Sequence, residues 1–256
     1  MYTPFDRSFR DRVLARETLF GMFLDIGAAV SAEVCAAAGY DWLLIDLEHG
    51  AATESDLLGL IQAVEVGGSI PLVRPQSGER LRIGRALDMG ARGIMVPRLD
   101  SAEQAAEAVT FLRYPPTGVR GVAIRVRGAG LGTVAHHQLG SLNERLLGIV
   151  QIESLGGLRE ADAIAALDGV DVLFVGPADL THSLGVPGNF EDPSYLAALD
   201  SVAAACCAHG KAAGILIYDR SSVPRLLEIG YTFIGIGSEG AFAADGAKRS
   251  LAAVRG

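Results

Sequence analysis

The sequence has few cysteines, few lysines and no long hydrophobic run. Its cysteines are Cys35, Cys206 and Cys207. This set cannot build a disulfide framework, and all three lie in alanine-rich segments where core packing explains them. No apolar run approaches the roughly 18 residues of a membrane span, and residues 1–7 contain no apolar signal segment. We therefore expect a soluble, cytoplasmic protein.

Dense clusters of basic residues are also missing. The formal net charge is −8, and no Lys/Arg cluster is strong enough to offset it. A nucleic-acid-binding surface needs such a cluster, so the composition argues against this class of protein. Hydrophobic residues, in contrast, make up half of the 256 residues, which is ample for a sizeable core.

Short apolar runs of strand length alternate with helical segments along the whole chain. Eight strands in this alternation predict a parallel sheet, and eight is the number that closes a (β/α)8 TIM barrel. We expect residues 1–256 to form this one domain. An open doubly wound sheet is the alternative, but Asp25–Ala28 is a poor version of its glycine-rich first turn. The predicted strands are Leu19–Asp25, Asp41–Leu47, Ile70–Val73, Gly93–Val96, Leu147–Ile152, Asp171–Val175, Ala212–Ile217 and Tyr231–Ile236.

Helices and two long loops fill the intervals. Residues 1–18 are charged and helix-prone, and we expect a lid helix there. Arg113–Ala135 and Thr181–Phe190 are rich in Gly and Pro, which is typical of functional loops. The other predicted helices are Ala28–Ala38, 53–66, Glu79–Met89, Ser101–Leu112, His136–Arg145 (a short helix or a loop), Leu155–Leu167, Pro193–His209, Ser221–Ile229 and Phe242–Val254.

Polar residues are rare where the predicted strands end, which is the rim that carries the chemistry of such barrels. His49 is the only histidine expected there, and its ordinary pKa near neutrality suits a general base; a structural histidine is the alternative. Glu48 is a weaker candidate, because strand alternation directs it away from the side of Leu47. The polar residues expected on this rim are Asp46, Glu48, His49, Arg74, Gln151, Glu153 and Asp179.

Glu153 and Asp179 follow two neighbouring strands and could share a divalent metal. Mg²⁺ or Mn²⁺ typically takes one or two carboxylates and keeps several waters. Alternatively, each acid caps the helix that follows it. Arg74 could pair with a carboxylate or a developing enolate oxygen, or form an ordinary surface ion pair. Asp46 could orient Arg74 or a water.

A glycine-rich run, Gly235–Ser238, follows the eighth predicted strand. It is typical of a barrel phosphate site, in which backbone N–H groups face an anion. Glycines that merely permit a tight turn explain the run equally well.

Several of these segments resemble the HpcH/HpaI aldolase family, the metal-dependent pyruvate aldolases typified by 4-hydroxy-2-oxoheptanedioate aldolase. The likeness covers nearly the whole chain in the order of the family's motifs. One residue departs from the pattern, because Leu47 stands where relatives often carry Gly. The matching segments are Asp41–Gly50, Pro71–Arg74, Ala86–Ala91, Gly93–Pro97, Tyr114–Gly121, Gln151–Glu153 and Phe174–Leu180.

The resemblance implies a role for each matching site residue. Glu153 and Asp179 would bind Mg²⁺, Mn²⁺ or Co²⁺, and Gln151 and the backbone of Ala178 would help hold the 2-oxo acid. Arg74 would stabilise the enolate and His49 would act as the base, through a water on the metal. Asp88 would pair with the histidine from a neighbouring subunit, which implies a homo-oligomer, commonly a hexamer with exchanged C-terminal helices. The roles fall on His49, Arg74, Asp88, Gln151, Glu153, Ala178 and Asp179, with Asp46 in support.

The activity implied is reversible aldol cleavage of 4-hydroxy-2-oxo acids to pyruvate and an aldehyde, a reaction of aromatic catabolism. A Schiff-base mechanism is disfavoured, because the only lysines are Lys211 and Lys248 and neither ends a predicted strand. The alternatives are a lyase acting on CoA thioesters such as malyl-CoA or citramalyl-CoA, and a non-catalytic barrel that binds phosphate. Arg120, Arg125 and Arg127 could receive an acidic aldehyde, or they could be ordinary surface arginines.

Overall fold

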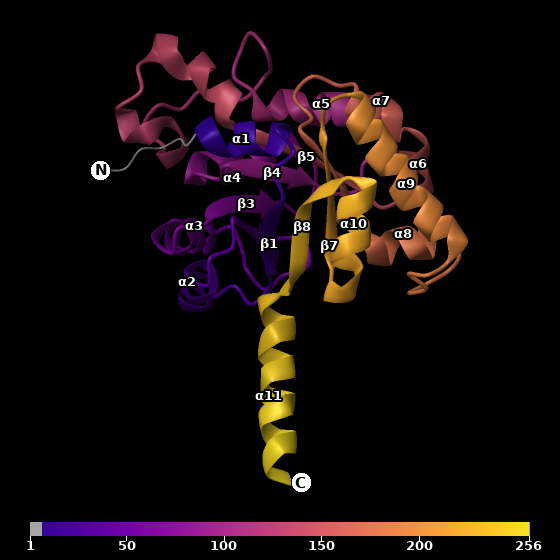
Figure 1. Ribbon diagram of the computed structural model, residues 1–256. Coiled ribbons are helices and arrows are strands. Elements are labelled where there is room, and N and C mark those ends of the chain that lie inside the picture. Colours follow the sequence, from indigo (N-terminus) through magenta and orange to yellow (C-terminus); the bar gives the residue numbers. More distant parts are fainter. Residues whose placement is uncertain (1–6, 256) are drawn as a thin grey trace.

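The structure is a computed structural model, and it describes residues 7–255. Eight parallel strands pair in chain order and close into a barrel, since β1 pairs with both β2 and β8. Helices cover the outside of the ring of strands (Figure 1). The predicted (β/α)8 fold is therefore confirmed. The strands are β1 (Leu19–Leu24), β2 (Trp42–Asp46), β3 (Ile70–Arg74), β4 (Gly93–Val96), β5 (Leu147–Ile152), β6 (Val172–Val175), β7 (Ala212–Ile217) and β8 (Tyr231–Ser238).

The helices follow the predicted order, with short 3-10 segments in the loops. No helix within residues 7–255 is long and apolar enough to cross a membrane. The α-helices are α1 (Arg7–Leu14), α2 (Ala29–Ala37), α3 (Leu57–Val66), α4 (Arg80–Met89), α5 (Ala102–Leu112), α6 (Leu155–Arg159), α7 (Ala161–Ala165), α8 (Pro177–Ser183), α9 (Pro193–Ala208), α10 (Val223–Ile229) and α11 (Glu239–Arg255); the 3-10 segments are η1 (Arg127–Gly132), η2 (His136–Arg145) and η3 (Arg220–Ser222).

Aromatic rings fill the inside of the barrel. The rings of Trp42 and Phe233 stack with centroids 4.4 Å apart, and Phe174 meets the Trp42 ring edge-on at 6.3 Å. A Cβ at Gly21 would lie 2.0 Å from the Trp42 ring, so only glycine fits at this point of β1. The interior is thus a packed core, and chemistry is left to the rims.

Helix α1 closes the mouth of the barrel at which the strands begin. Phe9 and Val13 are buried in the aromatic cluster inside the barrel. The Arg10 guanidinium donates two hydrogen bonds, of 2.7 and 3.1 Å, to Asp171, the residue before β6. The predicted lid helix is therefore present as α1, over the mouth where the strands begin, and residues 1–6 lie outside the described range.

Two helix boundaries also differ from prediction. The segment Leu155–Leu167 is two helices, because Glu160 departs from helical geometry (φ −94°, ψ 3°). Gly156 and Gly157 precede this break and weaken a continuous helix. The predicted loop Thr181–Phe190 begins inside α8, whose first helical residue is Pro177. Proline at a helix start is a favourable signal that periodicity in so short a helix does not reveal.

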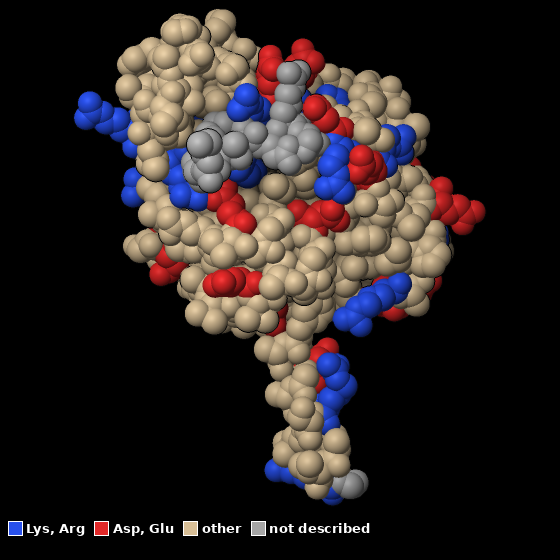
Figure 2. All heavy atoms as spheres, turned by 60° about the vertical axis from the view of Figure 1, so that its left-hand side comes forward, with Lys and Arg blue, Asp and Glu red and all other residues tan. Residues whose placement is uncertain are grey.

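Helix α11 runs away from the barrel (Figure 1). Of its side chains that the structure describes, only Glu239 is buried; its carboxylate accepts hydrogen bonds of 2.7 Å from the Ile26 N–H and the Ser31 hydroxyl. Beyond this base, Leu251 and Val254 are exposed. Figure 2 shows the helix as a stalk that carries both acidic and basic side chains. The predicted exchange of this helix between subunits stays a prediction.

Candidate active site

The core of the site is an ion pair between the ends of β2 and β3. Asp46 and Arg74 are partners in the strand register. The Arg74 Nε donates to Asp46 Oδ1 at 2.9 Å and its Nη2 donates to Oδ2 at 2.6 Å. Both side chains are buried, with 3% of Asp46 and 6% of Arg74 exposed. This two-bond geometry fixes the plane of the guanidinium, as expected for Asp46.

The remaining edge of Arg74 faces the middle of the rim. Its Nη1 donates to Gln151 Oε1 at 3.3 Å and lies 3.1 Å from Glu48 Oε2. Its guanidinium carbon lies 5.3 Å from the centre of the Phe23 ring, a cation–π contact. Arg74 therefore presents one nitrogen to any group that enters from the rim.

Glu153 is a buried carboxylate beside this arginine. Burial, together with the charges of Glu48 and Asp179, raises its pKa to about 7. Arg74 and a hydrogen bond from the backbone N–H of Arg98 act in the opposite direction but do not offset the rise. A carboxylate in such surroundings is stabilised as an anion by a cation placed next to it.

Asp179 reaches the same region from the first turn of α8 and is exposed at the rim. Gly176, at the end of β6, makes the approach possible. A Cβ there would lie 2.8 Å from Gln151 Nε2 and 2.9 Å from Glu153 Oε2. The glycine thus leaves room for these side chains beside α8. The two expected metal ligands lie at the same mouth of the barrel.

His49 lies at the rim, where 68% of its side chain is exposed. Its backbone N–H donates to Asp46 Oδ1 at 3.2 Å, and its Nε2 lies 3.8 Å from Glu48 Oε2. The imidazole therefore borders the site from the open side. Within this chain the imidazole forms an ion-pair contact with Glu48 at this distance, which is too long for a hydrogen bond.

Glu48 faces the site, contrary to the prediction from strand alternation. The strand ends at Asp46, whose Oδ1 accepts the Glu48 N–H at 3.0 Å. When a side chain accepts a hydrogen bond from the backbone N–H two residues later, the backbone turns. The alternation of side chains along a strand then no longer applies beyond that point. An Asp at a strand end is the signal that could have located Glu48.

Asp88 lies far from His49 in the chain fold. It belongs to the last turn of α4, where Arg120 Nη2 donates to its Oδ1 at 3.0 Å. Arg120 is buried and stacks on the Tyr114 ring at 4.4 Å. Helix α4 leads from the rim of the site back toward the start of β4, so Asp88 is at the opposite mouth. Its predicted pairing with His49 depends on a neighbouring copy.

The loop Arg113–Ala135 also lies at the opposite mouth, because it joins the end of α5 to the start of β5. Arg120 is held by Asp88, and Arg127 forms an ion pair with Glu65. Arg125 is exposed in the same loop. Within one chain these arginines therefore lie away from the rim of the site, and their contact with an acidic aldehyde stays a prediction. The composition of the loop gave no sign of its direction, which follows from its place between a helix and the next strand.

A second histidine stands at this rim, although only His49 was expected there. His182 lies on α8, one turn after Asp179, and its Nδ1 is 2.9 Å from the Ala178 carbonyl oxygen. It escaped the sequence analysis because α8 falls partly in the segment predicted as a loop. The backbone of Ala178 and the side chain of Asp179 share the first turn of this helix.

The lysines lie where the sequence suggested. The Lys211 Nζ donates to the carbonyl oxygens of Val170 and Leu167, at 2.8 and 3.2 Å, before β7 begins. Lys248 lies on α11. Neither ends a barrel strand, so the rim residues that follow the strands include no amine nucleophile.

Packing accounts for the glycines of the run Gly235–Ser238. A Cβ at Gly235 would lie 3.2 Å from the Trp42 ring. Gly237 has φ +65°, and a Cβ there would lie 2.9 Å from the Phe242 ring. The run therefore serves the end of β8 and the turn into α11, and a phosphate site there stays a prediction.

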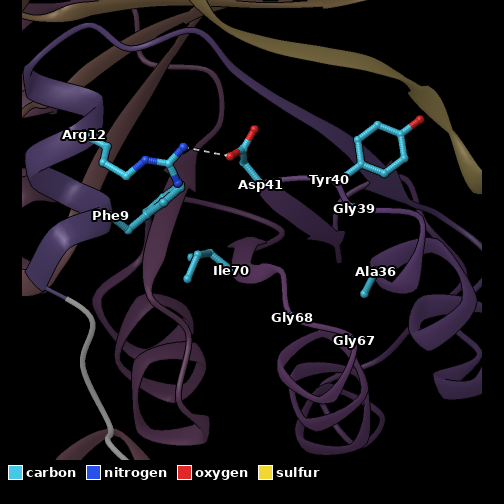
Figure 3. Close-up of a pocket in the computed structure, with 9 residues that line it drawn as sticks. All are labelled: Phe9, Arg12, Ala36, Gly39, Tyr40, Asp41, Gly67, Gly68 and Ile70. Atoms are coloured by element: carbon cyan, nitrogen blue, oxygen red, sulfur yellow. Dashed lines mark hydrogen bonds and ion pairs between the residues drawn. The ribbon is translucent and has the colours of Figure 1, made fainter.

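A hollow of about 250 Å³ opens at the opposite mouth, between the ends of α2 and α3 (Figure 3). The Arg12 Nη2 donates to Asp41 Oδ1 at 3.0 Å along its edge. Asp41 precedes β2, and Ile70, which also lines the hollow, begins β3. The hollow is thus separate from the rim that holds the acids and Arg74.

Known proteins resemble this chain over most of its length. A family model described as HpcH/HpaI aldolase/citrate lyase matches residues 19–245. The chain is 40% identical over 237 residues to a hydroxypyruvate/pyruvate aldolase of Pseudomonas aeruginosa, which covers 93% of this chain and 88% of that protein. It is also 40% identical over 230 residues to a 2-keto-3-deoxy-L-rhamnonate aldolase of Klebsiella pneumoniae subsp. pneumoniae, covering 90% and 86%.

A solved structure agrees with this assignment. The crystal structure of an HpcH/HpaI aldolase/citrate lyase family protein from Burkholderia cenocepacia J2315 has a TM-score of 0.92 and 37% identity to this chain. The superposition covers 98% of this chain and 100% of that one. The family match spans all eight strands and every rim residue considered above. The chain therefore belongs to the HpcH/HpaI aldolase/citrate lyase family.

Proposed function

We propose that this protein catalyses the reversible aldol cleavage of 4-hydroxy-2-oxo acids to an aldehyde and pyruvate or hydroxypyruvate, with a divalent cation. The observation that carries the proposal is the Arg74 guanidinium, fixed by Asp46 and presenting Nη1 to the rim. The guanidinium is thus oriented in advance to stabilise an oxygen that becomes negatively charged during the reaction. The names of the two relatives support an aldolase acting on a 2-oxo acid.

Glu153 and Asp179 are the residues that would hold the cation, which is Mg²⁺, Mn²⁺ or Co²⁺. The donor set fits, because Glu153 is buried with a raised pKa and Gly176 leaves room beside it. Among residues 7–255 no three His, Cys, Asp or Glu side chains form a complete metal site. Two carboxylates are nevertheless the usual protein share for Mg²⁺. When bound, the cation supplies Lewis-acid polarisation of the 2-oxo acid.

The other residues bind the substrate and move protons. Gln151 and the backbone of Ala178 help to hold the 2-oxo acid. In cleavage, His49 takes the proton of the C4 hydroxyl, the C3–C4 bond breaks, and its electron pair forms the enolate while the aldehyde leaves. Arg74 stabilises the enolate oxygen, and protonation at C3 then yields the free 2-oxo acid. In synthesis these steps run in reverse.

We further propose that the enzyme is a homo-oligomer, a hexamer in the family pattern. His49 and Asp179 are exposed in the single chain, so a neighbouring copy has room to close the rim. That copy would bring its Asp88 to His49 and exchange its C-terminal helix. A carboxylate at the imidazole would orient it and raise its basicity.

A panel of aldehydes incubated with pyruvate and with hydroxypyruvate, read by product mass, tests the reaction. Adducts of 4-hydroxy-2-oxo acid mass are expected with at least one donor. A chelator should abolish their formation, and Mg²⁺, Mn²⁺ or Co²⁺ should restore it. Full activity in chelator would reject cation dependence. Cleavage of malyl-CoA or citramalyl-CoA, with none of any free hydroxy-oxo acid, would favour the CoA-thioester lyase instead.

A further inference from the structure

Glu48 holds one oxygen in an unusual place. Its Oε2 is shielded from solvent but makes no hydrogen bond within residues 7–255. The atom lies 3.1 Å from Arg74 Nη1, as an ion pair without a directed hydrogen bond, and 3.8 Å from His49 Nε2. Buried carboxylate oxygens are normally bonded. A buried carboxylate oxygen that has no hydrogen bond, at the centre of a site, indicates that its donor comes with a ligand that enters the site.

Arg74 alone does not balance the charge of Glu48. Both oxygens of Asp46 already bond the Nε and Nη2 of Arg74, so its guanidinium is largely neutralised before Glu48 approaches. Glu48 is also the largest charged contributor to the raised pKa of Glu153, ahead of Asp179. Glu48 is therefore near enough to the acid pair for its charge to act on the same ligand.

We propose that Glu48 is a third acidic residue of the cation site, acting as a positioning residue beside the direct ligands Glu153 and Asp179. These three acids are not arranged as a complete ligand set in the part of the chain that the structure describes. Glu48 therefore does not bind the cation directly. Its free oxygen accepts a hydrogen bond from a water molecule that is bound to the cation. The inference rests on the proposed divalent cation.

The same side chain links the cation to Arg74. Nη1 is the guanidinium nitrogen of Arg74 that Asp46 does not bond, and it contacts both Glu48 and Gln151. Glu48 thus braces the nitrogen that is to meet the enolate oxygen. Residues that support direct metal ligands in this way typically change metal affinity or activity about 10–100-fold when they are replaced.

Titration calorimetry with Mn²⁺ on the full-length protein, without substrate, separates these roles. Glu48→Gln keeps the shape and a hydrogen-bonding group but removes the charge, and it should raise the Kd for Mn²⁺ about 10–100-fold. Glu33→Gln removes an exposed acid of α2 and should leave the Kd within about twofold. At saturating Mn²⁺, Glu48→Ala should also lower kcat, because Arg74 Nη1 loses its ion-pair partner.

A Kd for Glu48→Gln within twofold of wild type would overturn the inference. If that variant does not fold, as judged by thermal melting, the Kd of Glu48→Asp for Mn²⁺ is measured instead. Its shorter side chain withdraws the oxygen, so a Kd within twofold of wild type would again overturn the inference. Failure of the proposed function looks different: wild type itself would then bind no Mn²⁺, and Glu153→Gln would change nothing.

Discussion

At the scale of single residues, the Asp46–Arg74 pair does most to define the site. Two hydrogen bonds of 2.6 and 2.9 Å hold the guanidinium in a buried position. Its orientation is set by the protein, so a substrate needs only to meet one nitrogen. A lysine could carry the charge but not the two-bond geometry.

We predict that Arg74→Lys lowers kcat for 2-oxo acid turnover about 100- to 1000-fold, as expected when a group that stabilises an oxyanion is removed. Steady-state kinetics at saturating cation measure the effect, and thermal melting verifies that the variant is folded. Turnover within a few-fold of wild type would remove Arg74 from the enolate role.

Glu153 predicts a pH dependence of stability. Because its surroundings, burial above all, raise its pKa from the ordinary value of 4.5 to about 7, the folded protein binds this proton more tightly than the unfolded chain. The associated stability is complete below about pH 4.5 and is lost as the pH rises through 7. Between pH 5 and pH 8 this group alone should remove roughly 2–3 kcal/mol of unfolding free energy from the cation-free protein.

Urea unfolding at both pH values, on wild type and Glu153→Gln in chelator, measures this contribution as the difference between the two proteins. Wild type should lose more stability than the variant on going to pH 8. Equal losses would mean that Glu153 is not protonated near neutrality.

The sequence located these residues to different degrees for physical reasons. Asp46, Arg74, Gln151 and Glu153 end or follow recognisable apolar strands, so their common rim follows from the barrel alone. Glu48 was misplaced because a side-chain bond from Asp46 turns the backbone, and no periodicity records such a bond.

At the scale of secondary-structure elements, α1 stabilises the barrel at the mouth remote from the site. Asp171 is 1% exposed, is bonded by Arg10 and the Gly148 N–H, and lies 3.8 Å from Arg113. Arg113 is itself buried. The buried carboxylate of Asp171 therefore connects α1, β5 and the end of α5 through these hydrogen bonds and ion pairs.

We predict that Asp171→Ala lowers the unfolding free energy by about 3–5 kcal/mol, because it leaves a buried arginine unpaired. The matched change Arg12→Ala breaks a more exposed ion pair with Asp41 and should lower it by no more than about 1 kcal/mol. Urea unfolding compares the two variants. Equal losses would contradict the role given to the buried cluster, and folded Asp171→Ala should keep wild-type kcat.

Long helices and the apolar strands were predicted well, and short helices were not. The strands and the long helices α3, α5 and α9 agree with the sequence to within a few residues. Helix α8 spans seven residues, too few for an amphipathic pattern, although it carries Asp179. The direction of the Arg113–Ala135 loop follows from connectivity, not from its own composition.

At the scale of the whole molecule, α11 is the element that a single chain leaves uncovered. It stands outside the barrel (Figures 1 and 2), and its Leu251 and Val254 are 47% and 81% exposed. An isolated helix with exposed apolar residues gains stability by packing against another surface. The sequence alone could predict the helix, but only the family resemblance suggested that it leaves its own barrel.

We predict that the double variant Leu251→Glu, Val254→Glu dissociates the oligomer, because charged side chains do not pack in an apolar contact. Light scattering coupled to size exclusion should report a hexamer for wild type and for the matched control Leu251→Met, Val254→Ile. The charged variant should also lose activity, since Asp88 would no longer reach a neighbour's His49. A monomeric wild type, or a charged variant of unchanged mass, would contradict the assembly.

We propose that Arg74 and a cation held by Glu153 and Asp179 together convert a bound 2-oxo acid into its enolate. Exchange of the pyruvate methyl protons with D₂O, followed by NMR, tests it most directly because no aldehyde has to be known. With Mg²⁺ present, wild type should exchange these protons, and chelator, Glu153→Gln or Arg74→Lys should each reduce the rate at least about 100-fold. Exchange that continues undiminished in chelator, or that fails in the Mg²⁺-loaded wild type, would show that these residues and the cation do not form the enolate.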